Sequence, residues 1–209
     1  MILMLCIASV GGEFIRASQR SPIFVMGFGK TGTTSLYRYF QCGGYRVSHW
    51  KCLPDLLCGR CLFDNYYANR QILTGCGDYE VYTQLDSTEP PNNCFYPQTD
   101  LLDELHQQHP LSPWILNTRP FNHWLSSVMH WNNLTARLIG CGSIRDNTTE
   151  EFRNLYYERL NRVRKFWTTH KSHAFVEVNI ESPYAAHILF RHFGINTSCW
   201  GDANSNLKQ

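Results

Sequence analysis

Short apolar runs alternate along the chain with longer stretches of helical periodicity. This alternation is typical of an α/β domain with a central, mainly parallel sheet. The longest helical stretch spans residues 148–169, where Thr148 and Glu151 form a capping-box pattern before apolar residues at helical spacing. The pattern therefore predicts about five strands, which are residues 23–26, 45–50, 80–85, 114–118 and 174–180.

Two further helices are expected. One follows a Gly-rich turn and covers residues 33–40, and the other begins at Ser182-Pro183 and ends near Gly194. The connection at residues 51–61 is polar and rich in cysteine. Since no repeat or linker interrupts the pattern, residues 21–209 are predicted to form a single three-layer α/β domain.

Residues 1–20 precede this domain. Their first ten residues are apolar but lack a basic flank, and they fall short of the roughly 20 residues that a spanning helix needs. We interpret them as a signal segment or as the end of a signal anchor, with a core segment as the alternative. The hypothesis is a secreted or type II membrane protein.

Composition limits the classes of partner. Of 209 residues, 43% are hydrophobic and 17% are charged, which is typical of a folded globular protein. The formal net charge is only +2. A nucleic-acid partner is therefore not expected, and anion binding must come from local motifs.

Nine cysteines are many for this length. With Cys6 in the apolar opening segment, eight remain for up to four disulfides in an oxidising lumen, or for buried thiols in a cytosolic protein. Three glycosylation sequons, which start at Asn133, Asn147 and Asn196, favour the lumen of the secretory pathway, with the Golgi as the expected compartment. The eight cysteines are Cys42, Cys52, Cys58, Cys61, Cys76, Cys94, Cys141 and Cys199.

The turn after the first strand has the composition of an anion-binding loop. Residues 27–34 read Gly-Phe-Gly-Lys-Thr-Gly-Thr-Thr and open a helix, so that glycines, unsatisfied N–H groups and Lys30 meet at its N-terminus. A nucleoside-triphosphate P-loop would require glycine at Phe24, inside the strand. The predicted anion ligands are Gly29, Lys30, Thr31, Gly32, Thr33 and Thr34.

This shorter loop resembles the 5′-phosphosulfate loop of sulfotransferases that use 3′-phosphoadenosine 5′-phosphosulfate (PAPS). A second segment carries the resemblance further, because Arg119 ends an apolar strand and Ser127 follows eight positions later. In the family, such a pair binds the 3′-phosphate of PAPS. The resemblance implies a fold like that of P-loop-containing nucleotide hydrolases, PAPS as co-substrate, and no metal.

Candidate catalytic residues follow from the same resemblance. The segment from Tyr45 to His49 is similar to the Tyr-x-Val-x-His segment of heparan sulfate and related uronyl 2-O-sulfotransferases, whose histidine is the catalytic base. The resemblance implies His49 as base and Lys30 as the residue that stabilises the leaving phosphate. Asp86 is the alternative base. A zinc site built from His49, Cys52, Cys58 and Cys61 is a further alternative with weak spacing.

The predicted activity is sulfuryl transfer from PAPS to a hydroxyl acceptor, with a glycan as the expected partner. Alternatives are a P-loop kinase-like phosphotransferase, in which Asp86 would bind magnesium, and a non-catalytic family member that binds nucleotide or glycan. The chain lacks the Arg-Lys-Gly segment that closes over the nucleotide in cytosolic sulfotransferases. A different cover near the C-terminus, with Trp200 or Lys208, is expected instead. Acceptor identity and oligomeric state stay open.

Overall fold

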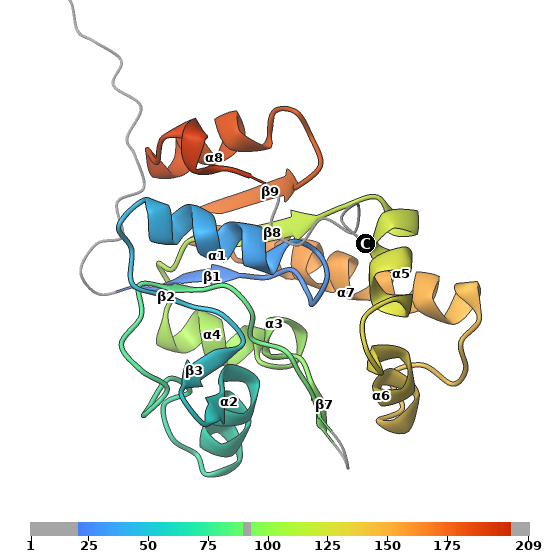
Figure 1. The fold of residues 1–209 in the computed structure, drawn as a ribbon. Helices are drawn as coiled ribbons and strands as arrows, with labels where there is room; N and C mark the ends of the chain where they lie inside the picture. Colours follow the sequence, from blue (N-terminus) through green and yellow to red (C-terminus); the bar gives the residue numbers. More distant parts are fainter. Residues whose placement is uncertain (1–20, 90–92, 202–209) are drawn as a thin grey trace, which may run out of the picture.

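The computed structural model describes residues 21–89 and 93–201, and the predicted apolar segment at residues 1–20 lies outside this range. Its centre is a parallel sheet with the strand order β2-β5-β1-β8-β9 (Figure 1). All five predicted strands are confirmed, although four of them are shorter than expected. They are β1 (Ile23–Val25), β2 (Val47–Ser48), β5 (Val81–Tyr82), β8 (Trp114–Thr118) and β9 (Phe175–Asn179).

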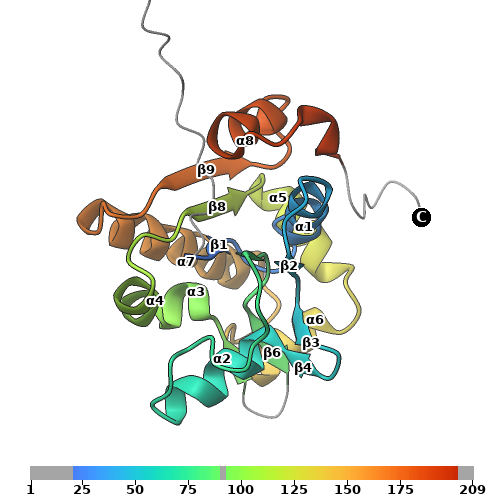
Figure 2. The same ribbon diagram turned by 90° about the vertical axis from the view of Figure 1, so that its left-hand side faces the viewer.

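Helices cover both faces of this sheet and complete the predicted three layers. In β1, Ile23 and Val25 pack in one core cluster while Phe24 packs in the other, because successive strand side chains point to opposite faces. The first cluster includes residues of α1 (Thr33–Cys42) and α8 (Ala185–Phe193). In Figure 2, α1 and α7 lie on opposite sides of β1. The second cluster includes residues of α4 (Leu102–Gln108), α5 (Phe121–Met129) and α7 (Thr149–Thr169), and the short α3 (Pro97–Asp100) precedes α4.

The helix ends test the predicted start and stop signals. At α7, the Thr148 hydroxyl accepts a hydrogen bond from the Glu151 N–H at 3.4 Å, which confirms the cap. At α8, Gly194 ends the helix at φ 68°, as expected, but the predicted start is wrong. The Ser182 hydroxyl accepts from the Tyr184 N–H at 3.2 Å and forms a local turn, so the helix begins later, at Ala185.

The cysteine-rich connection after β2 has more structure than predicted. It forms a hairpin of β3 (Lys51–Leu53) and β4 (Leu56–Leu57) and leads directly into α2 (Cys58–Tyr67). A disulfide between Cys52 and Cys58, with Cα atoms 4.8 Å apart, closes this hairpin. The remaining elements are the hairpin of β6 (Ser87–Glu89) and β7 (Asn93–Phe95), the helix α6 (Leu134–Gly140) and the 3₁₀ helix η1 (Thr197–Cys199).

All eight cysteines of the described part form disulfides, which confirms the prediction of four bridges. Three of the pairs link segments that the sequence separates by 15 to 157 residues. Because stable disulfides need an oxidising compartment, these bonds are compatible with a secreted or lumenal protein. Among the described residues, no helix has the length and apolar content needed to cross a membrane. The pairs are Cys42–Cys199, Cys52–Cys58, Cys61–Cys76 and Cys94–Cys141.

Candidate active site

The carboxyl ends of the five parallel strands meet at one cavity of about 1000 Å³. The chain passes from β1 to β2 and β5 on one side, and then to β8 and β9 on the other. Ligands of open α/β sheets bind where the strand order reverses in this way. Residues that follow each strand line the cavity: Gly29 and Lys30 after β1, His49 after β2, Gln84 and Asp86 after β5, Arg119 after β8, and Ile180 and Glu181 after β9.

Two glycines give the loop at residues 27–34 its shape. A Cβ atom on Gly27 would lie 2.1 Å from Oδ1 of Asn117, so only glycine fits against this side chain. Gly32 has φ 91°, and a Cβ atom there would lie 2.4 Å from Ile180. Gly32 is also the N-cap residue of α1, and no side chain caps this helix. Its N-terminus therefore faces the cavity with the partial positive charge of the helix dipole.

Asn117 in β8 fixes the position of the loop through three hydrogen bonds. Its Oδ1 accepts from the Gly27 N–H at 2.9 Å, and its Nδ2 donates to the Thr31 carbonyl at 2.9 Å and to the Thr31 hydroxyl at 2.7 Å. The N–H and hydroxyl of Thr31 both donate to the Phe28 carbonyl. Since Thr31 is fully buried and absent from the cavity wall, the predicted contact of its hydroxyl with the anion does not agree with this geometry.

Lys30 supplies the positive charge of the loop. Its backbone has φ 72°, a conformation uncommon for a residue with a side chain. Its ammonium lies 3.3 Å from the centroid of the Trp131 ring, which is a cation–π contact. Burial, and then the charge of Arg119, lower the pKa of Lys30 to about 8. Lys30 is therefore a cation near neutral pH that is held at the cavity wall without a carboxylate partner among the described residues.

His49 lies beside the same loop. Its Nε2 is 3.2 Å from the hydroxyl of Thr33 and 3.4 Å from that of Thr34, with donor and acceptor roles set by the ring tautomer. Burial lowers its pKa to about 4, so the imidazole is neutral at pH 7. A neutral ring nitrogen next to the hydroxyls of an anion-binding loop is placed to accept a proton from a group that enters the cavity.

Gln84 and Asp86 form the wall between His49 and the loop glycines. The Gln84 Oε1 accepts from the Thr33 hydroxyl at 3.1 Å. The Asp86 carboxylate accepts from the Gln84 amide at 3.5 Å and from the Gln98 amide at 3.3 Å. Burial raises the pKa of Asp86. Its carboxylate is thus held by two amides at the cavity wall.

Arg119 and Ser127, which both follow β8 in the chain, line the same cavity. Nη1 of Arg119 donates to the Lys30 carbonyl at 3.3 Å, while Nε is buried without a partner among the described residues. Ser127 lies two turns into α5 and lines the same cavity. The structure thus brings both predicted segments together, although 89 residues separate Lys30 from Arg119.

Glu181, which follows β9, forms an ion pair with one edge of the Arg119 guanidinium. Its Oε1 forms an ion pair with Nη2 of Arg119, and its Oε2 lies 2.5 Å from Nδ1 of His123. The Arg119 and Glu181 side chains are only 21% and 28% exposed. Burial acts to raise the pKa of Glu181, but the hydrogen bonds and charges of His123 and Arg119 together outweigh it and lower the pKa, so the carboxylate is charged at neutral pH. Any anion that binds Arg119 must compete with it.

Comparison with known proteins matches residues 22–188 to a family model described as a sulfotransferase domain. The chain belongs to this family. A search of curated proteins finds no match. The parallel sheet with helices on both faces is consistent with the sulfotransferase fold. Membership supports an enzyme that transfers sulfuryl groups from a sulfate donor.

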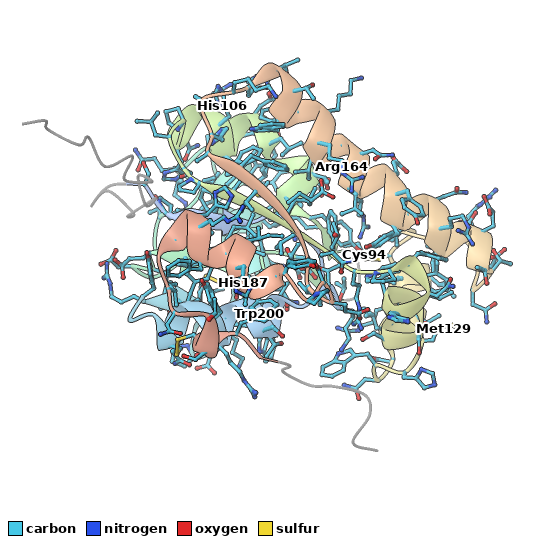
Figure 3. The ribbon with its side chains drawn as sticks, turned by 90° about the horizontal axis from the view of Figure 1, so that it is seen from above. Cys94, His106, Met129, Arg164, His187 and Trp200 are labelled. Atoms are coloured by element: carbon cyan, nitrogen blue, oxygen red, sulfur yellow. A yellow bond between two sulfur atoms is a disulfide. The ribbon has the colours of Figure 1, made fainter. Side chains whose placement is uncertain are left out.

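The zinc alternative and the expected position of Trp200 near the donor do not agree with the structure of this sulfotransferase domain. The zinc site is wrong, because Cys52, Cys58 and Cys61 are all in disulfides. Across residues 21–89 and 93–201, no three His, Cys, Asp or Glu side chains are grouped to hold a metal ion. Trp200 does not line the cavity and instead packs against Tyr39, 5.9 Å between ring centroids, below α8 in Figure 3. Lys208 lies outside the described residues.

Sequence reasoning missed three residues of this sulfotransferase site. Asn117 was detectable as a polar residue that directly follows three apolar residues in a buried strand. Glu181 follows a strand end, where ligand-binding residues gather in parallel sheets, but its pairing with Arg119 has no local signal. The contact of Trp131 with Lys30 likewise depends on how α5 and its following turn pack against the loop.

Proposed function

We propose that this protein transfers the sulfuryl group of PAPS to a hydroxyl group of a carbohydrate acceptor. One observation carries the proposal. A single cavity holds the loop with Lys30 at one helix N-terminus, Arg119 with Ser127 at the next strand end, and His49 within 3.2 Å of the loop hydroxyl of Thr33. Transfer of a sulfuryl group from a bisphosphorylated nucleotide to an alcohol requires two anion sites and a neutral base, and this cavity has all three.

The proposed binding roles follow from the contacts of the chain. The α1 N-terminus, Lys30, Thr33 and Thr34 would hold the 5′-phosphosulfate, because they combine N–H groups, hydroxyls and a cation. Arg119 and Ser127 would bind the 3′-phosphate. The cavity volume of about 1000 Å³ is at the upper end of the usual range for small-molecule sites, which leaves space for an acceptor beside the nucleotide.

The proposed chemistry uses His49 as base. Its Nε2 accepts the proton of the acceptor hydroxyl while the acceptor oxygen forms a bond to sulfur. The bond from sulfur to the bridging phosphate oxygen breaks, and the charge of the leaving phosphate develops beside Lys30 and the α1 N-terminus. The anionic nucleotide would raise the pKa of His49 above its value of about 4, which makes it a better base once PAPS is bound.

A lumenal location is part of the proposal. The four disulfides support an oxidising compartment, for which we propose the Golgi lumen. All three sequon asparagines, Asn133, Asn147 and Asn196, are exposed and therefore accessible to glycosylation. We also propose that residues 1–20, which lie outside the described range, serve as the membrane anchor or signal segment.

Calorimetry tests the nucleotide first. We expect adenosine 3′,5′-bisphosphate (PAP) to bind at least about 100-fold more tightly than ATP, since only PAP offers a 3′-phosphate to Arg119. Tighter binding of ATP with magnesium would instead favour the kinase-like alternative. PAP binding without any transfer from radiolabelled PAPS to a glycan panel would favour the non-catalytic alternative.

Two substitutions separate binding from chemistry. Lys30→Ala should weaken PAP binding by about 10- to 100-fold, because it removes a charged hydrogen-bond donor. His49→Ala should slow transfer by about 10²- to 10⁴-fold and leave PAP affinity nearly unchanged. The matched control is Lys171→Ala, because the Lys171 ammonium lies 3.2 Å from the Trp167 ring centroid, away from the cavity. Wild-type rates in both cavity variants would show that the proposed roles are wrong.

A further inference from the structure

The cavity has a second end that the proposed nucleotide contacts do not use. Its walls come from the β3–β4 hairpin, from β6 and from α6, which lie on the far side of β1 from β9 in Figure 1. The Trp50 side chain beside the first hairpin is 47% exposed. Since His49 precedes Trp50, this end begins at the proposed base. The lining residues of this end are Trp50, Leu57, Ser87, Thr88, Leu134 and Arg137.

Arg137 is the cation of this second end. Its Nε is buried and has no hydrogen-bond partner, and no ion pair is found for its guanidinium among the side chains that the structure describes, which leave out those of residues 89–93. The two carboxylates that line the cavity have other partners. Asp86 accepts from two glutamine amides, and Glu181 pairs with Arg119. A buried, unpaired guanidinium nitrogen is costly unless a ligand satisfies it.

A disulfide holds the Arg137 helix against the opposite wall. Cys94 in β7 bonds to Cys141, the C-cap residue of α6, with Cα atoms 5.6 Å apart. Next to it, the Tyr96 and Ser143 hydroxyls are 3.1 Å apart. The helix therefore keeps its position beside β6 when the cavity is empty or filled. Such pre-organisation lowers the entropy lost when a ligand binds.

We propose that Arg137 binds a carboxylate of an acidic saccharide and so selects the acceptor of the reaction. This inference rests on the proposed function. A guanidinium binds a carboxylate through two parallel hydrogen bonds, which also fix the orientation of the sugar. The indole of Trp50 offers an apolar face to a sugar ring, and the hydroxyls of Ser87 and Thr88 can bond its hydroxyl groups. These polar groups favour a saccharide over an acidic tyrosine peptide.

The test compares acceptors that differ only in charge. The probes are the unsulfated polymers heparosan and chondroitin, each beside its carboxyl-reduced form, with radiolabelled PAPS as donor. The wild type should prefer the carboxylated polymers. Arg137→Gln should raise KM for them by about 10- to 100-fold, and change KM for the reduced polymers less than about twofold. Arg137→Lys should recover part of the loss, because it keeps the charge but not the fork.

Controls make each outcome decisive. Arg191→Gln, on the exposed surface of α8, should leave all four KM values unchanged. Calorimetry should give Arg137→Gln the PAP affinity of the wild type, and weaker PAP binding would overturn the inference by placing Arg137 at the nucleotide. Equal losses on charged and reduced polymers, no preference of the wild type for carboxylated polymers, or transfer only to an acidic tyrosine peptide would also overturn it. A wild type that binds no PAP would overturn the proposed function, which the calorimetry reports separately.

Discussion

Replacing Asn117 by alanine should loosen the anion-binding loop and destabilise the fold. The substitution removes three buried hydrogen bonds, to the Gly27 N–H, the Thr31 carbonyl and the Thr31 hydroxyl. Each such bond contributes about 0.5–1.5 kcal/mol, and the Gly27 N–H loses its partner. The free energy of unfolding should therefore fall by about 2–4 kcal/mol. For a domain of this size, the corresponding decrease in Tm is about 4–16 °C.

The loop should lose ligand affinity together with stability. Without Asn117, the backbone of Gly27 and Thr31 is free to leave the conformation that aims Lys30 and the α1 N-terminus at the cavity. We expect PAP binding to weaken by about tenfold or more, as measured by calorimetry at a temperature where the variant is folded.

A matched control and a double-mutant cycle make this prediction refutable. Asn65 is also a buried amide, which donates to the carbonyls of Ile72 and Thr74 at 3.0 and 2.7 Å, but it lies away from the cavity. Asn65→Ala should lower stability and leave PAP affinity unchanged. Asn117→Ala and Thr31→Val each remove the same hydrogen bond between Asn117 and the Thr31 hydroxyl. The double variant should therefore lose about 0.5–1.5 kcal/mol less stability than the two single losses added together. Strict additivity, or equal PAP affinities in the two alanine variants, would refute the reasoning.

Three further predictions follow from charges and covalent bonds. Glu181→Gln should tighten PAP binding by about two- to tenfold in calorimetry and leave AMP binding unchanged. Only PAP brings a 3′-phosphate to Arg119, the partner of Glu181, so an equal gain in AMP affinity would contradict this. The pKa of His49 is about 4 in the folded chain and about 6.5 in the unfolded chain. Between these two pH values the unfolded state binds more protons, so the stability of the fold decreases as the pH drops from about 6.5 to about 4. Thermal unfolding of nucleotide-free His49→Gln should show a smaller loss over that window than the wild type, and identical pH profiles would argue against a buried neutral imidazole. Replacing Cys42 and Cys199 by serine should lower the free energy of unfolding by about 3–5 kcal/mol in denaturant titrations, because this disulfide joins residues 157 positions apart. A decrease below about 1 kcal/mol would show that the bond does not constrain the unfolded chain.

Much of the fold was predictable because its signals are local. Apolar runs identified all five strands of the sheet, and the spacing of Thr148 and Glu151 identified the start of α7. The start of α8 was missed because a serine can cap a turn as readily as a helix, and the Ser182 hydroxyl bonds to the Tyr184 N–H two residues on. Cysteine count predicted four disulfides but not their partners, since pairing depends on distances that the sequence does not contain.

The sequence by itself determined the kind of chemistry at the site, whereas the tertiary structure decided how each group is used. Glycines, Lys30 and hydroxyl residues in one short turn are sufficient to predict an anion-binding loop. Only the folded chain shows that the Thr31 hydroxyl bonds to Asn117 and that Glu181 forms an ion pair with the Arg119 guanidinium. These contacts join residues 62 to 86 positions apart, and periodicity and capping rules describe neighbours within a few residues. Parallel strands bring such distant residues together at their carboxyl ends, and that arrangement is a property of the sheet as a whole.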